Sequence, residues 1–185
     1  LPNTSRINAS NPCSEYMSID DSACNLASIN LMKFRREDGD LDVEAFEHTV
    51  DTVFLAQEIL VGYSSYPTPE IDRNAKAYRQ LGLGYANLGA FLMSRGFAYD
   101  SDEGRAFAAA VTALMTGRAY RKSAEIAGRM GPFAGHQPNA GAMIGVMSMH
   151  RAAVGNIEHS DSVPSDLLSA ARRSWDDALD LGEVS

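Results

Sequence analysis

The strongest structural signal in the sequence is a long alanine-rich segment that runs from Asp100 to Gly131. Asp100 and Glu103 have the spacing of a capping box at its start, and Gly131 followed by Pro132 is typical of a helix end. Large apolar residues recur along the segment at helical spacing: Phe107, Val111, Leu114 and Met115. The pattern predicts one long helix, and a chain built around it is expected to be mainly helical.

Other segments have the same helical periodicity. A helix is predicted over residues 43–63, with Asp40 and Asp42 as candidate capping residues. Further helices are predicted within residues 139–154, where small residues follow one face, and within residues 163–182, which are amphipathic.

Strand signals are few. Residues 24–34 mix apolar and polar side chains and fit either the start of a helix or a short strand. The first half of residues 79–96 is apolar and punctuated by glycine, like a short buried strand, whereas its second half is predicted to be helical. Residues 64–74 contain proline and are predicted to be a connector. The chain is therefore predominantly α-helical with a few short strands, which suits part of an α/β barrel better than a complete one.

Composition and charge set further bounds. The 185 residues suffice for one core, and residues 1–185 are treated as a single partial domain. Because the chain does not begin with Met and starts in a polar, loop-like stretch, we expect it to be an internal segment of a longer protein. The 24 acidic and 16 basic residues give a net charge of −8, which disfavours binding to DNA or RNA. No signal peptide or long apolar run is present, so we expect a soluble, cytoplasmic protein without membrane association.

A short stretch near the N-terminus, SNPCSEY, carries the candidate chemistry. Asn11, Cys13 and Glu15 alternate there, and on an extended chain they would point to the same side, about 6.5–7 Å apart. Pro12 favours the extended conformation because it disfavours a helical Asn11. The stretch predicts an extended strip or loop tip that offers an amide, a thiol and a carboxylate to one small ring.

These groups suit radical chemistry better than nucleophilic chemistry. A nucleophilic cysteine usually needs a nearby base such as histidine, and none is close in the sequence. A charged Glu15 would raise the pKa of the Cys13 thiol by repulsion. A neutral thiol can transfer a hydrogen atom while Glu15 takes a proton from a hydroxyl and Asn11 orients the substrate. Cys24 is then a candidate second, reducing thiol. The sequence has no CxxC motif or clustered histidines, so no metal site is expected.

The sequence NASNPCSEYMSIDDSACNLASINLMKF resembles the finger-loop region of ribonucleotide reductases. Its Asn-Pro-Cys-Ser-Glu wording and the short gap to the second cysteine are most similar to the adenosylcobalamin-dependent class II enzymes. The resemblance covers nearly the whole chain and is strongest in residues 1–34 and around residues 79–96. It implies an α/β parent fold, a ten-stranded α/β barrel with a central finger loop. Residues 1–34 would form the cysteine finger loop and the following segment, and residues 40–185 a mainly helical half of the barrel.

The resemblance also implies roles for individual residues. Cys13 would become a thiyl radical and abstract the ribose 3′-hydrogen, and Glu15 would be the base for the 3′-hydroxyl. Asn11 would hydrogen-bond the substrate hydroxyls. Backbone groups of Pro12 and Ser14 would help to line the substrate site.

Cys24 matches one of the two thiols that supply two electrons and end as a disulfide. The resemblance places the other thiol and most contacts to adenosylcobalamin outside this chain. It also places there the C-terminal thiols that would re-reduce the disulfide. The implied partners are a ribonucleotide, most simply a diphosphate, the remainder of the reductase chain, and a thioredoxin- or glutaredoxin-type reductant. A homodimer is an assembly that the resemblance allows for the parent. The isolated segment is expected to be inactive.

Three alternatives remain open at this point. In a two-cysteine thiol oxidoreductase, Cys13 and Cys24 would form a disulfide with each other. In a non-catalytic helical interaction domain, the loop cysteine would be incidental, and Cys13, Glu15 and Asn11 could be replaced at no cost. A class I reductase would keep the same residues but take its radical from a separate metal-bearing subunit.

Overall fold

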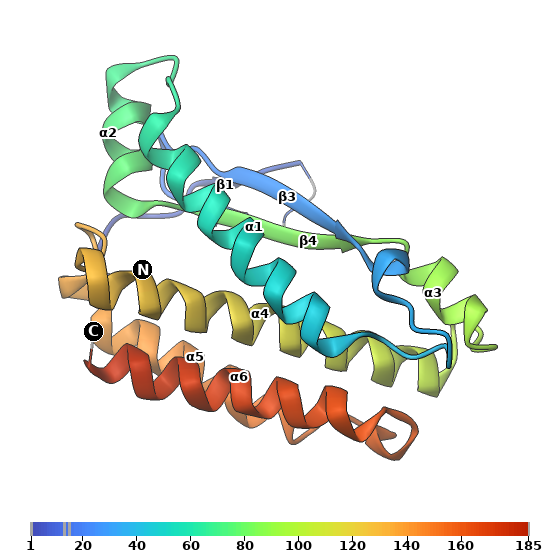
Figure 1. Ribbon diagram of the computed structural model, residues 1–185. Coiled ribbons are helices and arrows are strands. Elements are labelled where there is room, and N and C mark those ends of the chain that lie inside the picture. The colour runs from blue at the N-terminus through green and yellow to red at the C-terminus, as the bar shows by residue number, and fades with distance from the viewer. Residues whose placement is uncertain (1, 13, 15, 185) are drawn as a thin grey trace.

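The computed structural model describes residues 2–12, 14 and 16–184 (Figure 1). Its helices are α1 (Val43–Tyr63), α2 (Pro69–Tyr78), α3 (Leu88–Ser94), α4 (Asp102–Met130), α5 (Ala140–Val154) and α6 (Ser165–Val184). Its strands are β1 (Ala9–Ser10), β2 (Met17–Ser18), β3 (Asn25–Asn30) and β4 (Leu81–Ala86). Short 3₁₀ turns are η1 (Leu31–Phe34), η2 (Gln137–Asn139) and η3 (Ser160–Ser162). The prediction of a predominantly helical chain with a few short strands is confirmed.

The strands form two separate pairs. β1 and β2 are antiparallel and make a hairpin around the cysteine stretch, with Ala9 opposite Ser18. β3 and β4 are parallel, in a register that places Asn25 opposite Leu81 and Asn30 opposite Ala86. A parallel pair needs a crossover connection, which α1 and α2 supply here. Both strand segments suggested by the sequence are therefore strands, and they pair with each other.

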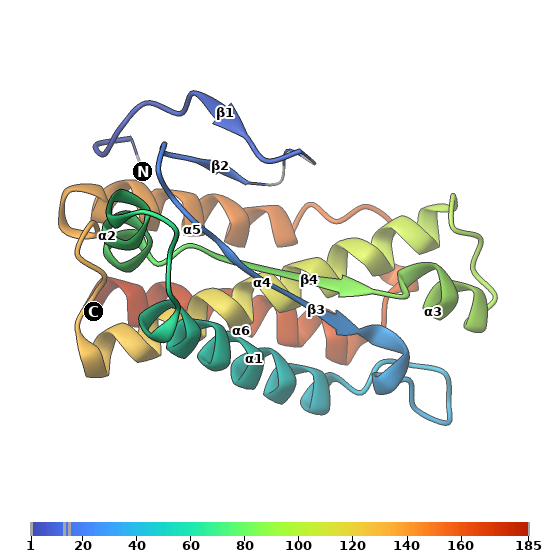
Figure 2. The ribbon, with the colours of Figure 1, turned by 90° about the horizontal axis from the view of Figure 1, so that it is seen from above.

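Helix α1 has the limits that the sequence predicts. The Asp42 side chain caps it by accepting a hydrogen bond from the Ala45 backbone N–H at 3.0 Å. The buried apolar side chains Phe46, Val50 and Val61 place the helix against the strand pair and α4. α1 thus forms the cover of the β3–β4 pair on one side, and the β1–β2 hairpin lies on the other side (Figure 2).

The prediction of a connector over residues 64–74 is only partly right, because α2 begins inside it at Pro69. The Thr68 hydroxyl accepts a hydrogen bond from the Ile71 backbone N–H at 3.2 Å. Proline is favourable in the first turn of a helix, where its missing N–H has no intrahelical partner to lose. The same residues that suggest a turn therefore start a helix.

The predicted start of α4 is also corrected. The capping residue is Ser101, whose hydroxyl accepts a hydrogen bond from the Gly104 backbone N–H at 3.0 Å. Asp100 instead forms an ion pair with Arg105. The end of the helix is as predicted, since Gly131 adopts a positive φ of 84° directly after Met130.

The core lies between α4 and the elements around it. α6 follows α4 along its length, α5 packs on α6, and α1 covers α4 from the side of the strands (Figure 1). No helix in the described part of the chain has the length and apolar character needed to cross a bilayer. The largest fully buried apolar side chains are Trp175, Phe46, Phe91, Phe107, Leu31, Leu41, Leu92, Leu114 and Leu167.

Candidate active site

The described part of the cysteine stretch is the turn of the β1–β2 hairpin. The Asn11 side-chain oxygen accepts a hydrogen bond from the Tyr16 N–H at 3.1 Å, and the Asn11 carbonyl accepts one from the Ser14 N–H at 3.1 Å. Ser14 has a positive φ of 63°, so the chain turns sharply there. The stretch is therefore a loop tip, one of the two forms that the sequence suggests.

The substrate-facing groups predicted in this turn are placed only in part. The Asn11 oxygen is used to close the turn, and its amide nitrogen makes no hydrogen bond with a described residue. Pro12 and Ser14 are exposed at the tip. Cys13 and Glu15 lie outside the described residues, so their shared orientation with Asn11 stays a prediction.

A buried asparagine fastens the N-terminal segment to the helical body. Asn139, which is fully buried, accepts a hydrogen bond from the Asn3 N–H at 3.0 Å through its side-chain oxygen. Its amide nitrogen donates to the Thr4 hydroxyl and to the Gly135 carbonyl, both at 2.9 Å. The segment that leads into the hairpin is thus held at the start of α5. Sequence reasoning missed this role, because an asparagine before a helix resembles an ordinary cap.

A second contact holds the segment that leaves the hairpin. The Asp20 carboxylate accepts a hydrogen bond from the Asn8 side chain at 2.8 Å, which ties the two arms together. The Asp20 carbonyl accepts one from the Asn74 side chain of α2 at 3.3 Å. The hairpin is therefore attached at both of its ends, to α5 and to α2.

Cys24 directly precedes β3 and is half-buried. Its thiol donates a hydrogen bond to the Asn25 carbonyl, with a sulfur–oxygen distance of 3.7 Å. On the neighbouring strand, a Cβ atom built on Gly82 would lie 3.4 Å from the Cys24 sulfur. The thiol thus packs against the backbone of β4 at the amino end of the strand pair, with no side chain of residue 82 between them.

The same end of the strand pair contains an unusual concentration of buried amides. Gln57 of α1 is only 3% exposed, and its amide nitrogen donates to the carbonyls of Asn25 at 3.0 Å and Gly82 at 2.8 Å. The Gln57 side-chain oxygen, the Asn25 side-chain nitrogen and the Gln80 side-chain oxygen are buried and have no hydrogen-bond partner among the described residues. Sequence reasoning missed Gln57, although its helical spacing from Val50 and Val61 puts an amide on an otherwise apolar face.

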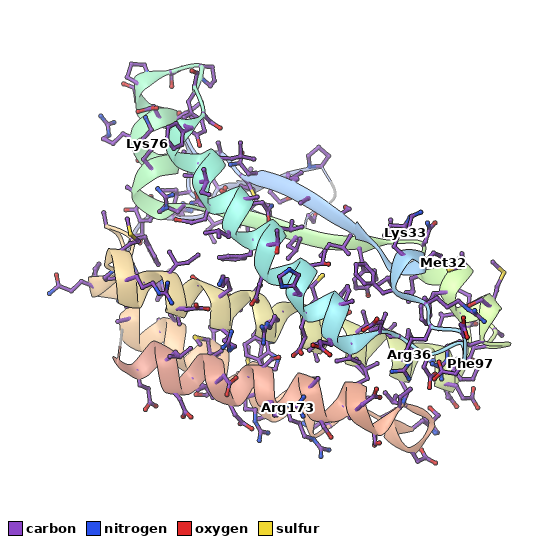
Figure 3. All side chains as sticks on the ribbon, viewed as in Figure 1. Met32, Lys33, Arg36, Lys76, Phe97 and Arg173 are labelled. Carbon is purple, nitrogen blue, oxygen red and sulfur yellow. The ribbon has the colours of Figure 1, made fainter. Side chains whose placement is uncertain are left out.

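A hollow on the surface lies away from this site. It has a volume of about 430 Å³ and mixed charges, with Arg36, Glu47, Asp166 and Arg173 among its lining residues. Figure 3 shows Arg36 at the same end of the molecule as Met32 and Lys33, which follow the carboxyl end of β3, whereas Lys76 on α2 lies at the opposite end. Cys24 precedes the amino end of β3. The hollow therefore belongs to a different part of the molecule.

The described residues contain no group of three or more His, Cys, Asp or Glu side chains that could hold a metal ion. On the long helix α4, burial raises the pKa of Tyr120, and a hydrogen bond from Lys122 lowers the pKa of Glu125. What the site offers is a half-buried thiol that packs against the strand pair and follows an anchored hairpin along the chain.

Comparison with known families shows to which family this chain belongs. Residues 1–184 match the family model described as ribonucleotide reductase, barrel domain. The chain belongs to the ribonucleotide reductase barrel family. The resemblance seen in the cysteine stretch is thus confirmed, and with it an α/β barrel as the fold of the parent.

Individual relatives support the same family. The chain is 53% identical over 182 residues to a vitamin B12-dependent ribonucleotide reductase of Rhodopirellula baltica, covering 98% of this chain and 17% of the relative. It is 48% identical over 186 residues to the vitamin B12-dependent ribonucleotide reductase of Streptomyces coelicolor, covering 98% of this chain and 19% of the relative. A vitamin B12-dependent ribonucleoside-diphosphate reductase of Mycobacterium tuberculosis is 32% identical over 133 residues, covering 72% of this chain and 19% of the relative. The chain thus spans less than a fifth of each of these reductases.

Proposed function

We propose that the full-length protein containing this chain reduces ribonucleotides, as diphosphates, to 2′-deoxyribonucleotides. The observation that carries the proposal is the match of the whole chain to vitamin B12-dependent reductases, at 53% identity to one of them. The geometry is consistent with it, because a half-buried thiol and an anchored cysteine hairpin lie in one continuous segment. Both alternatives outside the family lose support from this match.

The residues of this chain would divide the work as follows. Cys13 carries a thiyl radical and takes the 3′-hydrogen of the ribose, while Glu15 accepts the proton of the 3′-hydroxyl. Asn11 donates hydrogen bonds to the substrate hydroxyls through its amide nitrogen, and backbone groups of Pro12 and Ser14 line the site. Cys24 and a second thiol elsewhere in the parent give up two electrons and two protons and become a disulfide. The 2′-hydroxyl leaves as water, so the electrons balance.

Adenosylcobalamin would supply the radical that starts this reaction. By the family resemblance, its docking regions lie mostly in the rest of the parent, outside this chain. We propose three partners for this chain. They are the rest of the reductase chain, a thioredoxin- or glutaredoxin-type reductant that acts through C-terminal thiols of the parent, and a second copy of the parent in a homodimer. A cytoplasmic location belongs to the same proposal.

The test is the amount of product formed per site by the full-length protein. With thioredoxin present, the Cys24→Ser variant should complete at most one abortive turnover per site, because one of the two reducing thiols is lost. The Cys13→Ser variant should form no product while its affinity for the nucleotide stays within about twofold. Sustained turnover by Cys24→Ser, or product above background from Cys13→Ser, would contradict the assigned roles.

A control addresses the two-cysteine alternative. If Cys13 and Cys24 were a redox pair by themselves, mass spectrometry of the air-oxidised protein would find them joined in the fragment of residues 7–33. The reductase proposal expects no preferential pairing between them. It expects Cys24 to be joined to a cysteine outside this chain after one turnover without reductant.

A further inference from the structure

The buried amide of Gln57 is connected to Cys24 through a single carbonyl group. The Asn25 carbonyl accepts hydrogen bonds both from the Gln57 amide nitrogen, at 3.0 Å, and from the Cys24 thiol, at 3.7 Å. The residue that offers this carbonyl is the one directly after Cys24. A side chain on α1 therefore contacts an acceptor of the thiol.

The second hydrogen bond of Gln57 extends this contact to the other strand. The same amide nitrogen donates to the Gly82 carbonyl at 2.8 Å, and Gly82 is the residue whose missing side chain leaves room beside the Cys24 sulfur. Gln57 thus joins β3 to β4 at the position where the thiol is packed between them. Both of its contacts concern the immediate surroundings of Cys24.

Helix packing alone does not require this amide. Its neighbours on the buried face of α1, such as Val50 and Val61, are apolar, and an apolar residue at position 57 would bury no polar side chain there. It would, however, leave the carbonyls of Asn25 and Gly82 without this donor. Within the described part of the chain, the buried oxygen of Gln57 has no hydrogen-bond partner, which is unfavourable for stability. What the amide does supply is a pair of donors aimed at two carbonyls.

We propose that Gln57 is a positioning residue for Cys24: it fixes the Asn25 carbonyl against Gly82 and so holds the thiol in one orientation at the amino end of β3. This rests on the proposed function for the claim that the orientation serves reduction of the substrate. In that reaction the Cys24 sulfur must meet both the substrate and the second thiol, so a fixed orientation favours turnover. The positioning itself concerns only the residues described here.

The experiment uses the full-length, reduced protein and measures how fast Cys24 is alkylated by iodoacetamide. Cleavage after Arg6 and Lys33 yields one peptide, residues 7–33, that contains both cysteines. Fragment spectra of this peptide report the modification of each cysteine separately, so Cys13 is an internal reference. The test variant is Gln57→Met, which keeps a side chain of similar length and removes both donors.

The matched control is Asp51→Asn on the same helix, about 9 Å away at 1.5 Å per residue. Asp51 accepts two hydrogen bonds from Arg118 of α4, both at 2.7 Å, and contacts neither Asn25 nor Gly82. The control therefore weakens the packing of α1 without touching the surroundings of the thiol. A second test variant, Gln57→Asn, keeps a buried amide but is one methylene too short to reach both carbonyls.

We expect alkylation of Cys24 to be about tenfold faster in Gln57→Met, as for a contact that contributes about 1.4 kcal/mol. Alkylation of Cys24 should also be faster in Gln57→Asn. Cys13 in all variants, and Cys24 in Asp51→Asn, should stay within about twofold of the unchanged protein. In the reductase assay Gln57→Met should lower kcat about tenfold and leave KM for the ribonucleotide within twofold.

Two results would overturn the positioning role. One is alkylation of Cys24 at the unchanged rate in both Gln57 variants, or in Gln57→Asn if Gln57→Met does not fold. The other is equal acceleration of Cys24 in the Asp51→Asn control. Because alkylation needs no turnover, failure of the proposed function would show separately, as sustained turnover by Cys24→Ser.

Discussion

Replacement of Asn139 by alanine should release the N-terminal segment from the start of α5. The side chain is fully buried and makes three hydrogen bonds, with the Asn3 N–H, the Thr4 hydroxyl and the Gly135 carbonyl. Two of these join the segment that carries the cysteine hairpin to a residue 135 or 136 positions away. Alanine removes all three and leaves the Gly135 carbonyl without this partner.

The magnitude follows from the bonds that are lost. Each contributes about 1 kcal/mol net, so the loss is about 3 kcal/mol in total. Two of the three bonds oppose detachment of the segment, which corresponds to about 2 kcal/mol, or roughly 30-fold in the equilibrium for local opening. Asn74→Ala is a matched control: it removes one exposed hydrogen bond, to the Asp20 carbonyl, and should change local opening by less than about fivefold.

Hydrogen exchange followed by mass spectrometry measures this opening in the full-length protein, peptide by peptide. In Asn139→Ala, the amides of residues 3–12 should exchange at least tenfold faster, while those in the middle of α4 should keep their rate. Turnover should fall in the same variant, since the hairpin with Cys13 is attached through this segment. Unchanged exchange in residues 3–12, or equal acceleration in Asn74→Ala, would refute the idea that Asn139 is the main anchor.

Two further expectations concern packing and charge on the helices. Gly117→Ala should lower the thermal unfolding midpoint, because the added Cβ would lie 2.9 Å from the buried Trp175 ring. Such overpacking costs about 1–3 kcal/mol, which is more than the gain of about 1 kcal/mol in helix propensity. The control Gly145→Ala meets no atom within 4 Å and should raise the midpoint slightly; a rise in both would contradict this packing. The hydrogen bond from Lys122 lowers the pKa of Glu125, so its contribution is present above the unfolded-state pKa and lost as the pH falls through the folded-state pKa. The difference in midpoint between the protein and Glu125→Gln should therefore shrink on acidification from pH 7 towards 3, and a constant difference would count against it.

Local patterns in the sequence were sufficient for the long helices. The apolar repeat and the Asp42 cap gave the limits of α1, and Gly131 gave the end of α4, because helix periodicity and capping depend on residues within a few positions of each other. The same holds for the family: the Asn-Pro-Cys-Ser-Glu wording and the spacing to Cys24 are local. The sequence misled where one residue type serves two purposes, as Pro69 does when it starts α2 instead of extending a connector. It also misplaced the cap of α4, which is Ser101 and not Asp100.

The surroundings of Cys24 depended on tertiary structure. β3 pairs with β4 across α1 and α2, and Gln57 joins the two strands through the carbonyls of Asn25 and Gly82. The Asn139 side chain likewise accepts a hydrogen bond from the backbone N–H of Asn3, a residue far away in the sequence. In these contacts one partner is a backbone group, which every residue has, so no side chain marks it in the sequence. The sequence by itself therefore determined the long helices, the family and the candidate chemistry, whereas only the folded chain decided which buried amides hold that chemistry in place.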